Sequence, residues 1–145
     1  MLSLAALLAA TPAFAALDDL PAAVNGEAQR LGARWRPATL AAAQPVHRLE
    51  WPDGSSLRQF VDADGRVWAV AWNTRTAPRM DLLLGPHYAA WREALGRRQT
   101  AGARHAARVT AGDLVVESRM NGNAYTGRAW LRSRAPAGQG SDALR

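Results

Sequence analysis

The chain has 145 residues, of which 48% are hydrophobic and 21% charged, a composition that fits one globular domain and excludes a disordered or collagen-like chain. It contains neither cysteine nor lysine, which excludes disulfides, a lipid-anchoring cysteine, thiol nucleophiles and Schiff-base chemistry. The net charge is +6 and all 18 basic residues are arginine. A basic surface favours anionic partners, but the arginines are scattered along the sequence, so solvated surface charges are the preferred interpretation.

The first residues have the pattern of a signal peptide. Leu2 to Ala10 is apolar, and Ala13-Phe14-Ala15 is an A-x-A cleavage signature. The apolar run is shorter than the roughly 20 residues that a membrane-spanning helix needs. We therefore expect residues 1–15 to be removed, and the mature chain to be periplasmic or secreted without a transmembrane segment.

Residues 16–45 indicate an N-terminal leader and linker. Asn25 is placed to cap a short helix that runs through Leu31, and Gly32 is placed to end it. The stretch Arg34-Trp35-Arg36-Pro37 indicates linker. A single domain is expected to occupy residues 46–132.

Three strands are predicted at the start of this domain, over residues 46–51, 56–62 and 66–73. Turn residues separate them, namely Pro52-Asp53-Gly54-Ser55 and then Asp64-Gly65. Both faces of the third strand are apolar between Val67 and Trp72. This pattern predicts a central strand that is covered on both sides, with Trp68, Val70 and Trp72 sharing one face.

A helix is expected next, because Leu84, Tyr88, Trp91 and Leu95 fall on one helical stripe. Asp81 is placed to cap its opening turn. Gly85-Pro86 interrupts the pattern and predicts a short helical turn followed by a helix with Pro86 in its first turn.

Two further strands, 113–119 and 124–132, are joined by a hairpin loop over 120–123. Residues 133–145 are predicted to form a flexible tail. The order β-β-β-α-β-β predicts an α+β fold, with a roughly five-stranded antiparallel sheet and one main helix packed on one face.

Two long segments carry a family resemblance, QFVDADGRVWAVAWNTRTAPRMDLLLGPHY (59–88) and GDLVVESRMNGNAYTGRAWL (112–131). Together with the start ALDDLP at Ala16, they resemble the small exported proteobacterial proteins of domain-of-unknown-function family 2844. The resemblance implies a bacterial origin, export and one domain. It implies no activity, cofactor or catalytic residue.

No metal or cofactor site is expected. Asp62-Ala63-Asp64-Gly65 has the spacing of part of a calcium loop, but no closing glutamate follows, so a hairpin turn is the preferred interpretation. His47, His87 and His105 form no local ligand pair.

Enzymatic activity is not expected, because Ser55, Ser56 and Ser118 lie in no G-x-S-x-G motif, and no catalytic residue is assigned. The alternatives are a small periplasmic hydrolase-like enzyme built on His47 or His87, or an assembly factor for an envelope polymer or secretion system.

The leading hypothesis is a non-enzymatic periplasmic binding module that uses an aromatic sheet face. The residues assigned to ligand or partner binding are Trp68, Trp72, Trp130, Arg58 and Arg128. The same aromatic residues are also expected in a helix–sheet core, and only an uncovered face would make them a binding surface. The expected partner is an envelope protein or an anionic glycan or lipid, and export argues against nucleic acid.

Overall fold

The computed structural model describes residues 17–18, 34–39, 45–97 and 106–144, with the backbone alone for 35–39. The signal peptide predicted at 1–15 and the helix predicted from Asn25 to Leu31 lie outside these residues. Among the described residues, no helix has the length and apolar character needed to cross a membrane.

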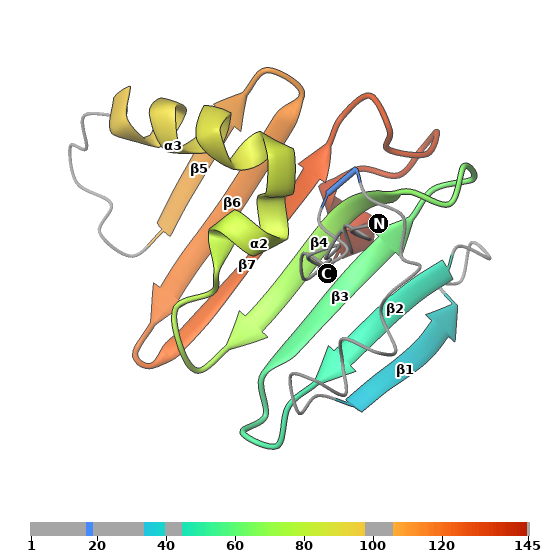
Figure 1. Cartoon of the computed structure of the whole chain (residues 1–145), viewed down its shortest axis with the longest axis vertical. Helices are drawn as coiled ribbons and strands as arrows, with labels where there is room; N and C mark the ends of the chain where they lie inside the picture. Colours follow the sequence, from blue (N-terminus) through green and yellow to red (C-terminus); the bar gives the residue numbers. More distant parts are fainter. Residues whose placement is uncertain (1–16, 19–33, 40–44, 98–105, 145) are drawn as a thin grey trace, which may run out of the picture.

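The described residues form one antiparallel sheet of seven strands in the order β1-β2-β3-β4-β7-β6-β5 (Figure 1). The strands are β1 Arg34–Thr39, β2 Pro45–Glu50, β3 Ser56–Val61, β4 Val67–Thr74, β5 Ala106–Ala111, β6 Leu114–Asn121 and β7 Ala124–Leu131. The helical elements are α2 Met80–Leu84, the 3₁₀ turn η1 Gly85–His87, α3 Tyr88–Arg97 and the 3₁₀ turn η2 Ser141–Leu144.

The predicted α+β class and antiparallel sheet are confirmed, but the predicted number of strands is too small. Arg34–Pro37 belongs to β1 rather than to a linker, and β5 adds a strand before the predicted hairpin. β1 was not predicted because it contains Pro37. Proline in a sequence pattern argues against a strand, although edge strands tolerate it. β1 and β5 both lie at sheet edges, where short strands carry little apolar alternation.

The helical segment is divided as predicted, since Gly85 has a φ of 49° and separates α2 from α3. Asp81 does not cap α2, because Arg79 occupies the N-cap position and no side chain caps the helix. Instead, the Asp81 carboxylate pairs with the Arg79 guanidinium at 2.6 Å. This pair places an acidic group in the first turn, where the helix dipole favours it.

The two faces of the sheet carry different covers. α2 and α3 cross one face, here called the helix-covered face, and pack there with Tyr88 and Trp91 against buried residues such as Val70 and Trp72 (Figure 1). Leu17, which is fully buried, joins this cluster and donates its N–H to the Leu83 carbonyl at 3.2 Å. The opposite face is here called the back face.

A β-bulge overturns the predicted arrangement of the β4 side chains. Phe60 pairs with Ala69 and Val61 pairs with Val67, so Trp68 is an extra residue on β4. The extra residue reverses the alternation of the strand. Trp68 therefore packs in the back-face cluster with Phe60, whereas Trp72 packs on the helix-covered face.

The C-terminal segment, residues 133–144, was predicted as a flexible tail but is packed on the back face. Leu144 is only 2% exposed and belongs to the same cluster as Trp68 and Trp130, with Ala135 packed beside it. The sequence gives little sign of this docking, because the segment consists mostly of Ala, Gly, Ser and Pro and has a single leucine near its end. The folded unit thus extends beyond both limits predicted for it.

Candidate functional site

Arginines that are far apart in the sequence lie in one row across the back face. The antiparallel register places these residues side by side on successive strands from β2 to β5: Arg48, Arg58, Ala71, Arg128, Glu117 and Arg108. Side chains of directly paired residues share one face of a sheet. The register therefore concentrates charge that looks scattered along the chain.

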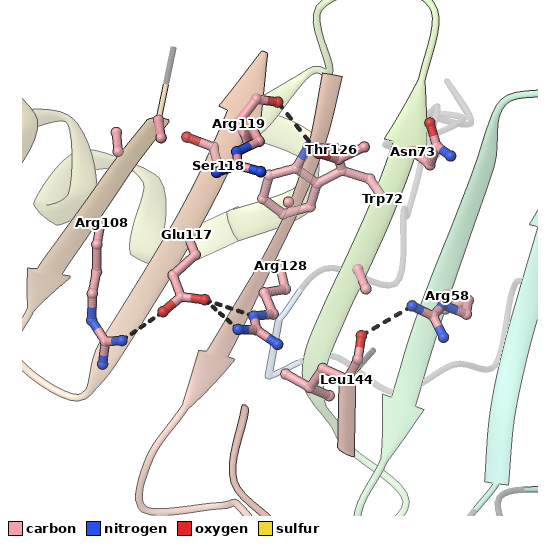
Figure 2. Close-up of a pocket in the computed structure, with 14 residues that line it drawn as sticks. Arg58, Trp72, Asn73, Arg108, Glu117, Ser118, Arg119, Thr126, Arg128 and Leu144 are labelled. Carbon is pink, nitrogen blue, oxygen red and sulfur yellow. Dashed lines mark hydrogen bonds and ion pairs between the residues drawn. The ribbon is translucent and has the colours of Figure 1, made fainter. Parts of the chain in front are cut away.

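A groove of about 810 Å³ runs along this row. The polar and charged residues that line it are Arg58, Asn73, Arg108, Glu117, Ser118, Arg119, Thr126 and Arg128, and Leu144 lies between Arg58 and Arg128 (Figure 2). We call it the arginine groove. Four arginines against one glutamate give its lining a strongly positive balance.

Glu117 is shared by two of the arginines. Its Oε2 accepts hydrogen bonds from Nε and Nη2 of Arg128 at 2.7 and 2.6 Å, and its Oε1 accepts one from Nη1 of Arg108 at 2.5 Å. The carboxylate thus orients both guanidinium groups while it neutralises only one of their two charges (Figure 2).

The arginine side chains lie against the aromatic residues of the buried cluster. The Arg58 guanidinium lies 5.7 Å from the centre of the Phe60 ring, and those of Arg108 and Arg128 lie 5.7 and 5.8 Å from the Trp130 ring. Such cation–π contacts restrict the guanidinium groups without consuming their hydrogen-bond donors. The aromatic residues thereby act as a support for the cations of the groove.

Arg58 is half-buried at the β3 end of the groove. Burial, and then the charge of the neighbouring Arg48, lowers the pKa of its guanidinium. Arginine nevertheless stays protonated in proteins, so this group is a cation that its surroundings solvate poorly. An anion bound in the groove would restore favourable interactions that burial has removed.

The binding residues predicted from the sequence divide into two groups. Trp68, Trp72 and Trp130 are 0%, 4% and 5% exposed, so the expected open aromatic face is absent and the prediction that Trp68 and Trp72 share a face is wrong. The bulge at Trp68 separates these two rings. Arg58 and Arg128 both line the arginine groove, and the buried Trp72 is also among its lining residues.

Sequence reasoning missed Arg108, Arg119 and Glu117 as parts of this site. Their positions within β5 and β6 were the available signal, because residues two apart on one strand share a face. That signal becomes useful only once the pairing partners of each strand are known. The arginines were instead interpreted as scattered.

Among the other candidate groups, Ser118 lines the groove, whereas Ser55 and Asp62 lie apart from it. The Ser55 hydroxyl donates to Asp53 Oδ2 at 3.0 Å within the turn and accepts the N–H of Arg75, just after β4, at 3.0 Å. Asp62 Oδ1 accepts the N–H groups of Asp64 and Arg66 at 3.0 and 2.9 Å, which are the contacts of a hairpin turn. These contacts give each side chain a role in local structure.

The histidines gather into no metal centre among the described residues, where no group of three or more potential His, Cys, Asp or Glu ligands occurs. His47 lies in β2 and His87 in η1, while His105 lies outside the described part of the chain. Partial burial lowers the pKa of His47.

Comparison with known proteins identified one match, to a protein family. No match was found among curated proteins or among solved structures. Residues 13–144 match one family, which covers nearly the whole chain, including the sheet, the groove and the docked C-terminal segment. The chain therefore belongs to the family described as a protein of unknown function, DUF2844.

Proposed function

We propose that this protein is an exported, non-catalytic binding module that holds an acidic glycan in the arginine groove. The observation that carries the proposal is the row of cations that register assembles on the back face. Several arginines along one open groove repel each other and thereby destabilise the folded state, and a bound anion would offset this repulsion. Guanidinium groups suit carboxylates and phosphates because their donors form paired hydrogen bonds.

The shape and polarity of the groove favour a glycan over other anionic ligands. It is an open trough that crosses several strands, and Asn73 and Thr126 add an amide and a hydroxyl beside the arginines. Such groups suit the hydroxyls of a sugar chain. The apolar residues that line the groove, such as Ala71, Ala107 and Leu144, lie among charged side chains, which an acyl chain would leave without partners.

Export rests on the sequence of the N-terminal region. The apolar run from Leu2 and the Ala13-Phe14-Ala15 signature support removal of residues 1–15 and delivery to the periplasm or beyond. Acidic glycans are abundant in that environment, whereas nucleic acid is not the expected partner there.

The proposal is tested by binding of the purified protein to polygalacturonate, a polymer of carboxylated sugars, with neutral dextran as the control polymer. We expect binding to polygalacturonate alone, weakened as the salt concentration rises, because exposed charges are screened. Arg58→Gln and Arg108→Gln should each raise the dissociation constant by about tenfold, the loss expected for one charged hydrogen-bond partner.

Arg97→Gln is the matched control, since it removes the same charge from α3, on the other side of the sheet. It should change the dissociation constant by less than about twofold if the groove is the site, because a distant exposed charge is strongly screened. Equal effects of Arg97→Gln and Arg58→Gln would reduce the binding to net charge and refute the proposal. Stronger binding to vesicles containing phosphatidylglycerol than to polygalacturonate would reassign the ligand to a lipid surface.

A further inference from the structure

We infer that the C-terminal turn η2, Ser141–Leu144, is an internal plug of the arginine groove that a bound anion must displace. This inference rests on the proposed function and adds regulation of the same site. Three features of the described residues support it: where Leu144 sits, what the two central arginines bind, and how the segment is attached.

Leu144 occupies the middle of the arginine row. Figure 2 shows it between Arg58 and Arg128, which lie on either side of Ala71 in the register of β3, β4 and β7. Its side chain lines the groove and at the same time packs on the back-face cluster at 2% exposure. A ligand that contacts both arginines must pass through the volume that Leu144 fills.

The plug binds the groove through the chemistry that an anion would use. Arg58 Nη2 donates to the Leu144 carbonyl at 3.0 Å, and Arg128 Nη1 donates to the Ser141 carbonyl at 2.5 Å. Carbonyl oxygens are neutral acceptors, and an ionised acceptor makes a hydrogen bond about twice as strong with the same guanidinium. A carboxylate is therefore equipped to replace them.

Arg128 is bound within the protein at each of its three guanidinium nitrogens. Its Nε and Nη2 contact Glu117 Oε2, and its Nη1 donates to the Ser141 carbonyl. These contacts engage three of the five N–H donors of the group. A ligand that binds Nη1 from the side of η2 therefore competes with the Ser141 carbonyl.

The attachment of the segment allows it to leave as a unit. Arg134, at its start, is held by Asp62 at 3.0 Å and by Asp18 at 2.9 Å, so this point stays fixed. Between Arg134 and η2 the chain runs through Pro136 to Gly140 and contains Gly138 at a φ of 78°. Release beyond Arg134 costs at least the packing of Leu144 and Ala135 and the hydrogen bonds that Arg58 and Arg128 donate to carbonyls of η2, while the sheet keeps its pairing.

The first test uses Leu144→Ser in the full chain, which removes the apolar anchor and leaves every arginine in place, with the volume-conserving Leu144→Met as the matched control. Because a closed plug lowers the fraction of molecules able to bind, Leu144→Ser should reduce the dissociation constant for polygalacturonate by about tenfold, and Leu144→Met should leave it near the wild-type value. Circular dichroism must show an unchanged sheet in both variants.

The second test follows the plug itself. The chain has no cysteine, so Ala143→Cys provides a unique position for a spin label next to Leu144. The label should be immobile in the free protein and mobile when polygalacturonate saturates the groove. It should also become mobile without any ligand when Arg58→Gln and Arg128→Gln are combined, since these side chains hold η2.

The outcomes separate the inference from the proposed function. Binding that depends on Arg58 but is unchanged or weakened by Leu144→Ser would overturn the plug and leave the groove as a binding site. A label that stays immobile in the Arg58→Gln, Arg128→Gln variant would also overturn the plug, whatever binds. Wild-type affinity for polygalacturonate that Arg58→Gln does not alter would overturn the proposed function.

Discussion

The two faces of this sheet are formed by the same strands but differ in their polarity and in the elements that cover them. The helix-covered face is apolar along β4, where α2, α3 and Leu17 enclose Val70 and Trp72. The back face carries a smaller apolar cluster around Phe60, Trp68 and Trp130, and the row beside it is mostly charged. The helix-covered face therefore contributes mainly to stability, whereas the back face combines an apolar cluster with the charged row for which we propose anion binding.

The contrast teaches that an aromatic residue in a strand says little about exposure. All three sheet tryptophans with described side chains, Trp68, Trp72 and Trp130, are buried, and they support neighbouring residues instead of meeting a ligand. Trp130 lies beneath the guanidinium groups of Arg108 and Arg128. Its role in recognition would be indirect, by holding these cations in place.

The largest expected effects compare the two faces directly. Trp72→Ala and Trp68→Ala each remove a buried ring, from the helix-covered face and the back face respectively, and each should lower the free energy of unfolding by about 3–5 kcal/mol. Urea denaturation measures both, with the exposed hairpin variant Asn123→Ala as a control expected to stay within about 0.5 kcal/mol. A loss below about 1 kcal/mol for Trp68→Ala alone would show that the C-terminal segment covers the back face poorly.

A smaller effect is expected at Gly127, where the absence of a side chain makes room for Trp72. A Cβ at this position would lie 2.5 Å from the Glu117 carbonyl oxygen and 2.7 Å from Cε2 of Trp72. Gly127→Ala should therefore lower the free energy of unfolding by about 1–3 kcal/mol, the usual result of overpacking.

Gly96 offers the matched control for that substitution, since a Cβ there meets nothing within 4 Å. Gly96→Ala lies within α3 and should be neutral or stabilising by up to about 1 kcal/mol, because alanine favours helix. Thermal denaturation of the two variants compares them; an unchanged melting temperature for Gly127→Ala would contradict the close packing of Trp72.

Glu117→Gln changes the charge of the arginine groove and leaves the helix-covered face unaltered, so it tests the back face separately. Loss of the shared carboxylate should cost about 1 kcal/mol of stability, since the Arg128–Glu117 pair is only partly buried. The same change leaves the charges of Arg108 and Arg128 uncompensated, so affinity for polygalacturonate should rise and become more sensitive to salt. Titration at two salt concentrations measures this, and weaker binding would indicate that Glu117 serves mainly to orient the arginines.

The smallest effect is a pH dependence that arises at His47. Burial lowers its pKa from the ordinary value of 6.5, so the unfolded chain takes up a proton at higher pH than the folded protein. Stability should therefore fall as the pH decreases through about 6.5 and level off below the folded pKa, by less than about 1 kcal/mol because the ring is partly exposed. Urea midpoints at pH 7.5 and 5.5 measure this slope, which His47→Gln should remove. A slope that persists in His47→Gln would assign it to another group.

The sequence predicted β2 to β4, the helical segment and the β6–β7 hairpin well, because their turns carry strong local signals, but it missed β5. Gly65 and the Asp62 side chain, for example, define the hairpin before β4. The bulge at Trp68 left no such signal, and a single inserted residue reversed the faces assigned to Trp72 and Trp68. Local pattern fixes where a strand lies more readily than which way its side chains point.

The site was less predictable than the fold, for a related reason. Arg58, Arg108 and Arg128 come together through the register of four strand pairs, and no local pattern specifies a register. The docking of Leu144 depends on the same assembled surface, since the hollow that receives it exists only when β3, β4 and β7 are paired.

Pro37 in β1 affects how readily two molecules of this protein can associate through their sheet edges. In the described part of the chain β1 pairs only with β2, so its outer side is an edge of the sheet. Proline has no N–H, and a strand that approaches this edge finds one donor missing from the ladder it would extend. The residue that made this stretch look like a connector thus discourages uncontrolled strand-to-strand association between molecules.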